Sequence, residues 1–203
     1  LLHNLMVDNT TTGILVSGQN DVRIIGNTIY SPLGDNIRLN SGASEIEIRN
    51  NILWAEGGYD IFVANDSQAG FFSDYNNLYA TGAGKLVHWI LASNGRVLDF
   101  DDILDWQEDI HRYDLHSIGR TELQPTGAEP RFVNRHWGDF EVFGQPAGQR
   151  FTSPTIDAGD PAGAREAISG SKATLSAVPY HLNLDLAEAA AMPMTYVTAL
   201  YAL

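Results

Sequence analysis

The segment 27–30 (NTIY) recurs 24 residues later as 51–54 (NILW), and this repeat is the strongest structural signal in the chain. Two further segments share the pattern of an asparagine followed by apolar residues, 4–7 (NLMV) and 77–80 (NLYA), at spacings of 23 and 26 residues from their neighbours. A period of this length is typical of solenoids, in which each period forms one coil that stacks on the previous coil.

Two other sets of segments keep the same offset. The first comprises 13–18 (GILVSG), 36–42 (NIRLNSG) and 60–66 (DIFVAND), and the second comprises 21–27 (DVRIIGN), 45–51 (EIEIRNN) and 70–77 (GFFSDYNN). Each period of about 24 residues therefore predicts three short strands. Within the strands apolar and polar residues alternate, as half-buried strands require, with Val22 and Ile24 on one side and Arg23 on the other.

Strands that repeat at one fixed translation stack in parallel, about 4.8 Å apart, so that equivalent residues form rows across the coils. At the asparagine position this stacking places Asn27 over Asn51, and Asn51 over Asn77. Amide side chains stacked in this way form a ladder of hydrogen bonds. We interpret these asparagines as structural residues.

The repeats resemble those of right-handed parallel β-helix proteins, a group that shares its fold with pectate lyases and other polysaccharide-processing enzymes. The resemblance continues in motifs that follow one another as in the C-terminal parts of uncharacterised secreted bacterial members. These motifs are DYNN (74–77), DWQ (105–107), D-x-H-S (114–117), EPRF (129–132), GDF (138–140) and SPTIDAGDP (153–161). The resemblance implies an all-β, pectate-lyase-like fold and no single activity, because this fold carries lyases, hydrolases, epimerases and structural proteins.

We expect three parts in the chain: residues 1–80 as the C-terminal coils of a β-helix, 81–161 as a capping region, and 162–203 as an alanine-rich tail of undetermined structure. Because the chain enters within a coil, we expect further coils upstream of Leu1. No signal peptide pattern is present at the start. Beyond residue 80 the period is lost and large aromatics appear that suit a lid over the core, namely Trp89, Trp106 and Trp137.

The capping region contains its own local signals. Residues 101–109 (DDILDWQED) predict a short helix with Asp101 as its N-cap. Residues 130–133 and 139–143 predict strands. The segment 153–161 predicts a tightly turned end to this region.

The charge balance restricts the class of partner. The chain has 25 acidic and 12 basic residues, with a formal net charge of -13, which argues against nucleic acid and anionic membranes. Polyanionic polysaccharides would be repelled as well, so neutral glycans fit better. The absence of cysteine excludes disulfides and thiolate chemistry, and no apolar run is long enough to predict a membrane-spanning helix.

Tyr30 and Trp54 occupy equivalent positions in successive coils. The alternation of the strands places Ile29 and Leu53 inward and the two aromatic rings outward. A stacked pair of exposed rings would form a platform for the C–H faces of pyranose sugars. The alternative interpretation is that the capping region or the tail folds over them.

Charged residues form a second candidate surface on the strands 21–25 and 45–49. Arg23, Glu47 and Arg49 share one face, where they would either bind sugar hydroxyls or form a solvated ion-pair patch. Asp21 lies one coil from Glu45, at roughly the carboxylate separation of retaining glycosidases, but any two acids at one coil position have this spacing. We therefore assign no catalytic residue.

Metal sites receive little support. The histidines lack metal-ligand spacing, and we predict no bound metal or other cofactor, although calcium is possible at Asp157 and Asp160 or at Asp35 and Asp60. The motif Asp114-x-His116-Ser117 offers an acid, a base and a nucleophile, but neighbours on an extended chain point apart. We interpret it as a structural turn.

These observations favour a carbohydrate-associated β-helix segment of an extracellular or cell-surface protein that binds or helps to process a polysaccharide. One alternative is a structural or adhesive solenoid without catalytic activity. Another is a polysaccharide lyase or glycoside hydrolase whose site lies mainly in N-terminal coils outside this sequence. The polymer and the oligomeric state are left open.

Overall fold

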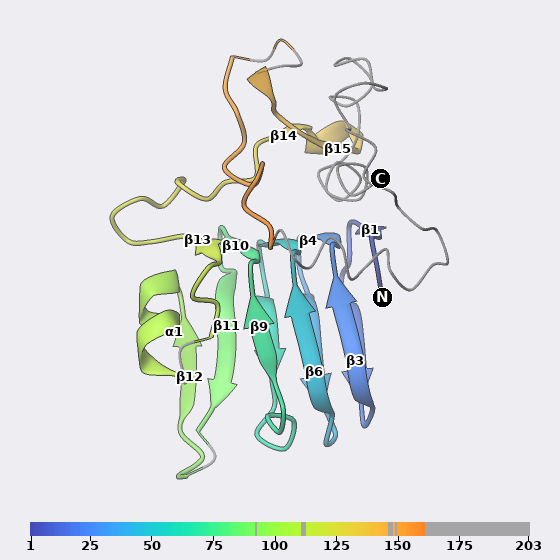
Figure 1. Ribbon diagram of the computed structural model, residues 1–203, viewed down its shortest axis with the longest axis vertical. Coiled ribbons are helices and arrows are strands. Elements are labelled where there is room, and N and C mark those ends of the chain that lie inside the picture. Colours follow the sequence, from blue (N-terminus) through green and yellow to red (C-terminus); the bar gives the residue numbers. More distant parts are fainter. Residues whose placement is uncertain (92, 111–112, 146–147, 149, 161–203) are drawn as a thin grey trace, which may run out of the picture.

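The computed structural model describes residues 1–91, 93–110, 113–145, 148 and 150–160. These residues form an all-β solenoid of stacked parallel coils, closed at the far end of the stack by a short helix (Figure 1). The solenoid fold, the period of about 24 residues and the three strands per coil are therefore confirmed.

Each coil contributes strands to sheets that run along the solenoid. Sheet I contains β1 (Leu5–Met6), β4 (Thr28–Ser31), β7 (Ile52–Ala55), β10 (Asn77–Ala80) and β13 (Ile118–Gly119). Sheet II contains β2 (Thr12–Ser17), β5 (Asp35–Asn40), β8 (Tyr59–Val63), β11 (Lys85–Ile90) and β12 (Val97–Phe100). Sheet III contains β3 (Asn20–Ile25), β6 (Ser44–Arg49) and β9 (Phe72–Asp74).

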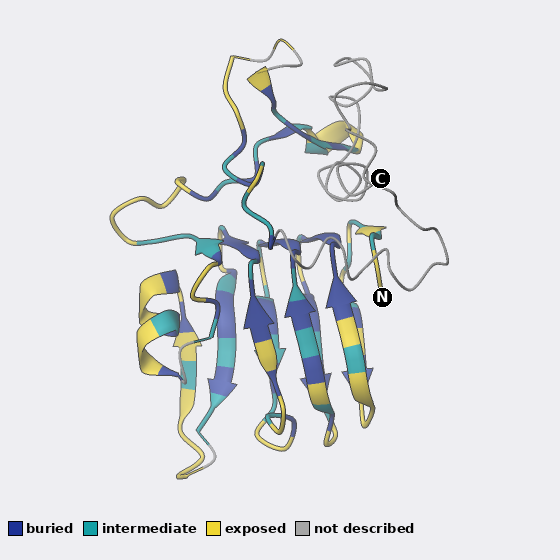
Figure 2. Ribbon diagram, in the orientation of Figure 1, coloured by how far each residue is buried: buried dark blue, intermediate teal, exposed yellow. Residues whose placement is uncertain are grey.

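The core fills the interior of the coils with branched aliphatic side chains. Bands of buried and less buried residues along β6 mark the alternation that the sequence predicts, whereas β3 and β9 run from exposed starts to buried ends (Figure 2). The fully buried members include Ile24, Ile29, Ile37, Leu39, Ile48, Leu53, Ile61 and Leu78. Each coil buries its apolar row against the next coil, which is why the stack is stable although no single coil is.

The asparagine ladder runs through Asn4, Asn27, Asn51 and Asn76. The side chain of Asn27 donates to Asn51, and that of Asn51 donates to Asn76, each at 3.0 Å. The expectation of Asn77 as the third member is wrong, because β10 pairs with β7 in a register that places Asn77 beside Ile52. Asn77 instead donates to the backbone oxygen of Ala128 at 2.8 Å.

The parallel pairing continues beyond residue 80, where the sequence period is no longer visible. Strand β11 pairs in parallel with β8, and β13 pairs in parallel with β10. The chain between them forms β12, which is antiparallel to β11, and the helix α1 (Ile103–Asp109). This insertion lengthens the last coil and hides its repeat.

Helix α1 covers the end of the core with Trp106, which is fully buried. Its N-cap is Asp102 and not the predicted Asp101, because the side chain of Asp102 accepts from the backbone N–H of Leu104 at 2.7 Å. Trp89 is also buried at this end. The prediction for Trp137 is wrong, since this residue is 88 % exposed.

A hairpin outside the solenoid follows. Strand β14 (Phe132–Asn134), the 3-10 turn η1 (Arg135–Trp137) and β15 (Asp139–Val142) lie over the sheet I side of the coils (Figure 1). Both predicted strands are confirmed, with boundaries shifted by one or two residues. The segment 153–160 then turns back to the solenoid, and the tail 162–203 lies outside the described residues.

Within the part of the chain that the structure describes, no helix has the length and apolar composition needed to cross a membrane.

Candidate functional site

Tyr30 and Trp54 point away from the coil interior, as expected, but they are only 7 % and 5 % exposed. Of the two interpretations of this pair, the structure shows the covered one, because the hairpin β14–β15 of the capping region lies over both rings. Phe132 stacks on Trp54 with ring centroids 5.9 Å apart, and Phe140 lies 5.7 Å from Tyr30. These rings form a second apolar cluster beside the main core.

Arg135 from the turn η1 fixes the hairpin to this cluster. Its guanidinium donates to the hydroxyl of Tyr30 at 2.6 Å, lies 4.4 Å from the ring centroid of Trp54, and forms an ion pair with Glu56 at 2.9 Å. Burial raises the pKa of Tyr30, which keeps its hydroxyl neutral. In this conformation the aromatic surface of sheet I binds the hairpin.

Sheet III brings Arg23, Glu47 and Arg49 together as the sequence predicts. Strands β3 and β6 place Arg23 beside Glu47, and their side chains lie 3.4 Å apart. The other oxygen of Glu47 accepts from Arg49 at 2.8 Å. The carboxylate of Glu47 is therefore held between two guanidinium groups at the outer surface of the solenoid.

Phe72 completes this surface and was not recognised from the sequence. Strand β9 places it next to Glu47, and the residue is 46 % exposed. No other described aromatic ring stacks on it. The signal was present in the third copy, 70–77, because aligning it with 45–51 puts Phe72 in the row of Arg23 and Glu47. We call the four residues Arg23, Glu47, Arg49 and Phe72 the sheet III face.

The segment before residue 161 forms one border of this face. Asp160 accepts from Arg49 at 3.0 Å, and its backbone N–H donates to the side-chain oxygen of Asn50 at 2.6 Å. Asp160 is therefore held in place as the ion-pair partner of Arg49. The part of the sheet III face that stays exposed contains Glu47, Phe72 and Arg23, and 62 % of the Arg23 side chain is accessible.

The motif Asp114-x-His116-Ser117 is a structural turn, as expected. Asp114 is fully buried and ends the asparagine ladder, where it accepts from Asn76, Ser117 and Trp106. Burial raises the pKa of Asp114. His116 points outward, pairs with Asp74 at 2.7 Å, and does not approach Ser117 in the manner of a triad.

No protein-family model, curated protein or solved structure matches the chain.

Three of the four aspartates considered as calcium ligands make other contacts, among them the ion pair of Asp160 with Arg49. Asp35 accepts from the side chain of Arg38 at 2.6 Å and from the backbone of Tyr59 at 3.0 Å. Asp60 is fully buried beside Asn36, and burial raises its pKa well above the usual range. Among the described residues no group of three or more His, Asp or Glu side chains is arranged to hold a metal ion.

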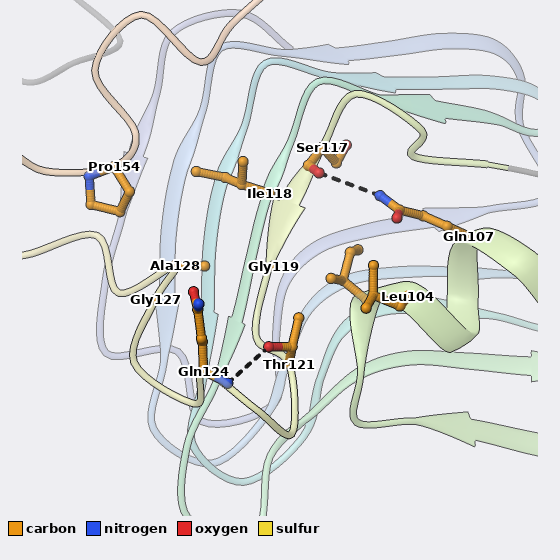
Figure 3. Close-up of a pocket in the computed structure, with 11 residues that line it drawn as sticks. Leu104, Gln107, Ser117, Ile118, Gly119, Thr121, Gln124, Gly127, Ala128 and Pro154 are labelled. Atoms are coloured by element: carbon orange, nitrogen blue, oxygen red, sulfur yellow. Dashed lines mark hydrogen bonds between the residues drawn. The ribbon is translucent and has the colours of Figure 1, made fainter.

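A cavity of about 270 Å³ lies between α1 and the loop that follows β13 (Figure 3). Its walls are mainly apolar, with Leu104, Ile118 and Pro154 among them. The polar groups at its rim bond to one another: Gln107 donates to the backbone of Ser117 at 3.4 Å, as the dashed line shows. The cavity therefore offers few polar groups to orient a ligand.

Proposed function

We propose that this solenoid binds a neutral polysaccharide on the sheet III face, as a carbohydrate-associated protein of the extracellular or cell-surface environment. The observation that carries the proposal is the row formed by Arg23, Glu47 and Phe72, in which an exposed aromatic ring lies beside an ordered ion pair. The resemblance of the repeats to right-handed, pectate-lyase-like β-helix proteins supports the same class.

The chemistry of the row suits sugars. The C–H face of a pyranose packs on an aromatic ring, and Phe72 has its ring at the surface. Guanidinium and carboxylate groups form paired hydrogen bonds with neighbouring hydroxyls. Because Arg49 holds Glu47 on the protein side, the carboxylate of Glu47 loses little side-chain entropy when a ligand arrives.

The charge of the face favours a neutral ligand. Each arginine has an acidic neighbour, since Arg23 lies beside Glu47 and Arg49 contacts both Glu47 and Asp160. The chain as a whole carries a net charge of -13. A polyuronate would therefore meet a repulsive field with no excess of positive charge on the face to offset it.

The geometry of the row also sets the direction of the ligand. Arg23, Glu47 and Phe72 belong to successive coils, and successive coils lie about 4.8 Å apart. An extended glycan would therefore lie along the solenoid axis and cross the strands, with neighbouring sugars over neighbouring coils.

The test is a screen of neutral and acidic glycans, followed by calorimetry of any ligand found. Phe72→Ala is expected to weaken binding about tenfold, the loss that corresponds to one stacking contact. Trp137→Ala is the matched control, because Trp137 is also an exposed aromatic residue but lies on the hairpin. Equal losses for the two variants, or binding only to acidic glycans, would refute the proposal.

Binding of no glycan by the unaltered protein would instead favour a structural or adhesive solenoid, the alternative that the sequence left open.

A further inference from the structure

A second organised row crosses sheet II on the outside of the solenoid. Arg38, Phe62, His88 and Asp99 occupy paired positions on the neighbouring strands β5, β8, β11 and β12. None of these residues belongs to the sheet III face. Their proximity depends on the parallel pairing of β5, β8 and β11 in successive coils and on the antiparallel return of β12 onto β11.

Phe62 is held between two cationic or potentially cationic groups. The guanidinium carbon of Arg38 lies 3.6 Å from the ring centroid of Phe62. On the other side the imidazole of His88 stacks in parallel, with centroids 4.2 Å apart and an interplanar angle of 5°. Both faces of the Phe62 ring are covered, because Arg38 lies on one face and His88 on the other.

Asp99 determines which nitrogen of His88 is available. The two side chains form a hydrogen bond of 2.7 Å between Nδ1 of His88 and the carboxylate. An ionised carboxylate only accepts hydrogen bonds, so the neutral imidazole carries its proton on Nδ1 and its lone pair on Nε2. Among the described residues Nε2 has no hydrogen-bond partner, and it is not one of the buried polar atoms that lack one.

Arg38 is oriented in a comparable way. Its Nε donates to Asp35 at 2.6 Å, which leaves the two terminal nitrogens without a partner in the described part of the chain. The other titratable groups around the row are Tyr59, whose ring centroid lies 5.0 Å from that of His88, and Lys85, which pairs with Asp101 at 2.8 Å. Burial, followed by the neighbouring Asp99, raises the pKa of Tyr59 to about 12, so its hydroxyl stays neutral.

We propose that this row is a hydrolytic site for neutral O-acyl esters, with His88 as general base and Arg38 as the group that stabilises the developing oxyanion. Carboxylate-held imidazoles with a free Nε2 are suited to take a proton from water. The guanidinium of Arg38, on the opposite face of Phe62, would stabilise the negative charge on the carbonyl oxygen of an ester bound over the edge of that ring.

The reaction balances with water as the only co-reactant. Nε2 of His88 takes a proton from water while the water oxygen bonds to the ester carbonyl carbon, and the carbonyl π electrons move to the oxygen beside Arg38. The tetrahedral intermediate then re-forms the carbonyl and breaks the bond to the alkoxide. His88 returns the proton to the leaving oxygen, so the products are a carboxylic acid and an alcohol.

The charges around the site favour an ester as the substrate over a phosphodiester or a glycosidic bond. A phosphodiester would carry negative charge towards Asp35 and Asp99, in a chain whose net charge is -13. A glycosidic bond requires two carboxyl groups flanking the oxygen, whereas Asp35 is committed to Arg38 and Asp99 to His88. A neutral ester acquires only one negative charge in the transition state, which one arginine can stabilise.

The experiment measures hydrolysis of p-nitrophenyl acetate above the buffer rate, with the whole chain and as a function of pH. His88→Gln is expected to lower kcat about 100-fold, because the general base is lost. His116→Gln is the matched control, because His116 also pairs with an aspartate at 2.7 Å but has no arginine across an aromatic ring.

Two further variants distinguish a loss of catalysis from a loss of folding. Asp99→Asn keeps the shape of the side chain but no longer fixes the tautomer, so kcat should fall while the thermal midpoint changes little. Arg38→Lys retains the charge and loses the planar fork, so kcat should fall with a smaller change in KM. A rate equal to that of buffer, or equal losses in His88→Gln and His116→Gln, would overturn the proposal.

Discussion

Asn51 and Asn76 lie one coil apart, and the side-chain nitrogen of Asn51 donates to the side-chain oxygen of Asn76 at 3.0 Å. The oxygen of Asn51 in turn accepts from the side chain and the backbone of Asn27. Each amide side chain thus forms hydrogen bonds with the coils on both sides of it. The ladder couples the coils at one corner of the solenoid, where the chain turns from sheet III into sheet I.

Asn51→Ala should therefore destabilise the fold by about 3 kcal/mol, because it leaves buried donors of Asn27 and a buried acceptor of Asn76 without partners. The free energy of unfolding from urea titration measures the effect. Asn77→Ala is the comparison, since Asn77 makes one side-chain hydrogen bond, to Ala128, and should cost about 1 kcal/mol. A larger loss for Asn77→Ala would contradict the assignment of Asn76 to the ladder.

Asp114 closes the ladder at the last coil, so Asp114→Ala should lower the unfolding free energy by at least about 3 kcal/mol. The change removes the acceptor for the indole N–H of Trp106, for the hydroxyl of Ser117 and for the amide of Asn76. Exchange of the Trp106 indole proton, followed by NMR, should speed up in the variant. Unchanged exchange would show that Trp106 does not depend on this carboxylate.

Asp60 should make stability depend on pH. Burial raises the pKa of this carboxyl well above its value of 3.8 in the unfolded chain, so the folded state favours the neutral acid. The contribution to stability is complete below pH 3.8 and is lost as the pH rises through the folded pKa. Asp60→Asn cannot ionise, so its stability relative to the unaltered protein should increase with pH.

Urea titrations of both proteins between pH about 4 and about 8 test this expectation. Asp21→Asn serves as the control, because Asp21 is exposed at the start of β3. A stability difference between Asp60→Asn and the unaltered protein that is the same at every pH would mean that Asp60 ionises normally.

Phe132 should be the main apolar contact that holds the hairpin on sheet I. Phe132→Ala removes a ring that stacks on Trp54 and packs 5.0 Å from Phe140, and such truncations cost about 3 to 5 kcal/mol. Trp54 should become accessible to acrylamide quenching, at temperatures where circular dichroism still reports intact coils. Quenching that matches the unaltered protein would show that the hairpin stays in place without this ring.

The period of the solenoid was readable from the sequence because each coil repeats the same pattern of apolar residues and a corner asparagine. An apolar residue at every second position must face the core, and the asparagine at the corner must form hydrogen bonds with the amide side chains of the two neighbouring coils. These requirements recur at Asn27 and Asn51 and reveal both the strands and their parallel stacking. The one-residue error at Asn77 arose because the third coil is longer than the first two.

The candidate sites were readable only in part. Arg23 and Glu47 were recognised because they occupy equivalent positions in clearly repeated segments, and Arg49 because it lies two residues from Glu47 on the same strand. Phe72 lay in an expanded copy. Arg38 and Phe62 lie in aligned segments, but His88 comes after the sequence period is lost at residue 80, so the complete row could not be read from the sequence.

The sequence by itself determined the coil, its period and the inward or outward direction of most strand residues, because these properties depend on contacts that repeat at one spacing. Tertiary structure alone decided which outer faces are covered and which stay exposed. Arg135 covers Tyr30 across 105 residues, and Asp160 reaches Arg49 across 111 residues. Such contacts depend on how the last coil, the hairpin and the segment 153–160 fold back onto the solenoid. No local sequence pattern encodes this arrangement.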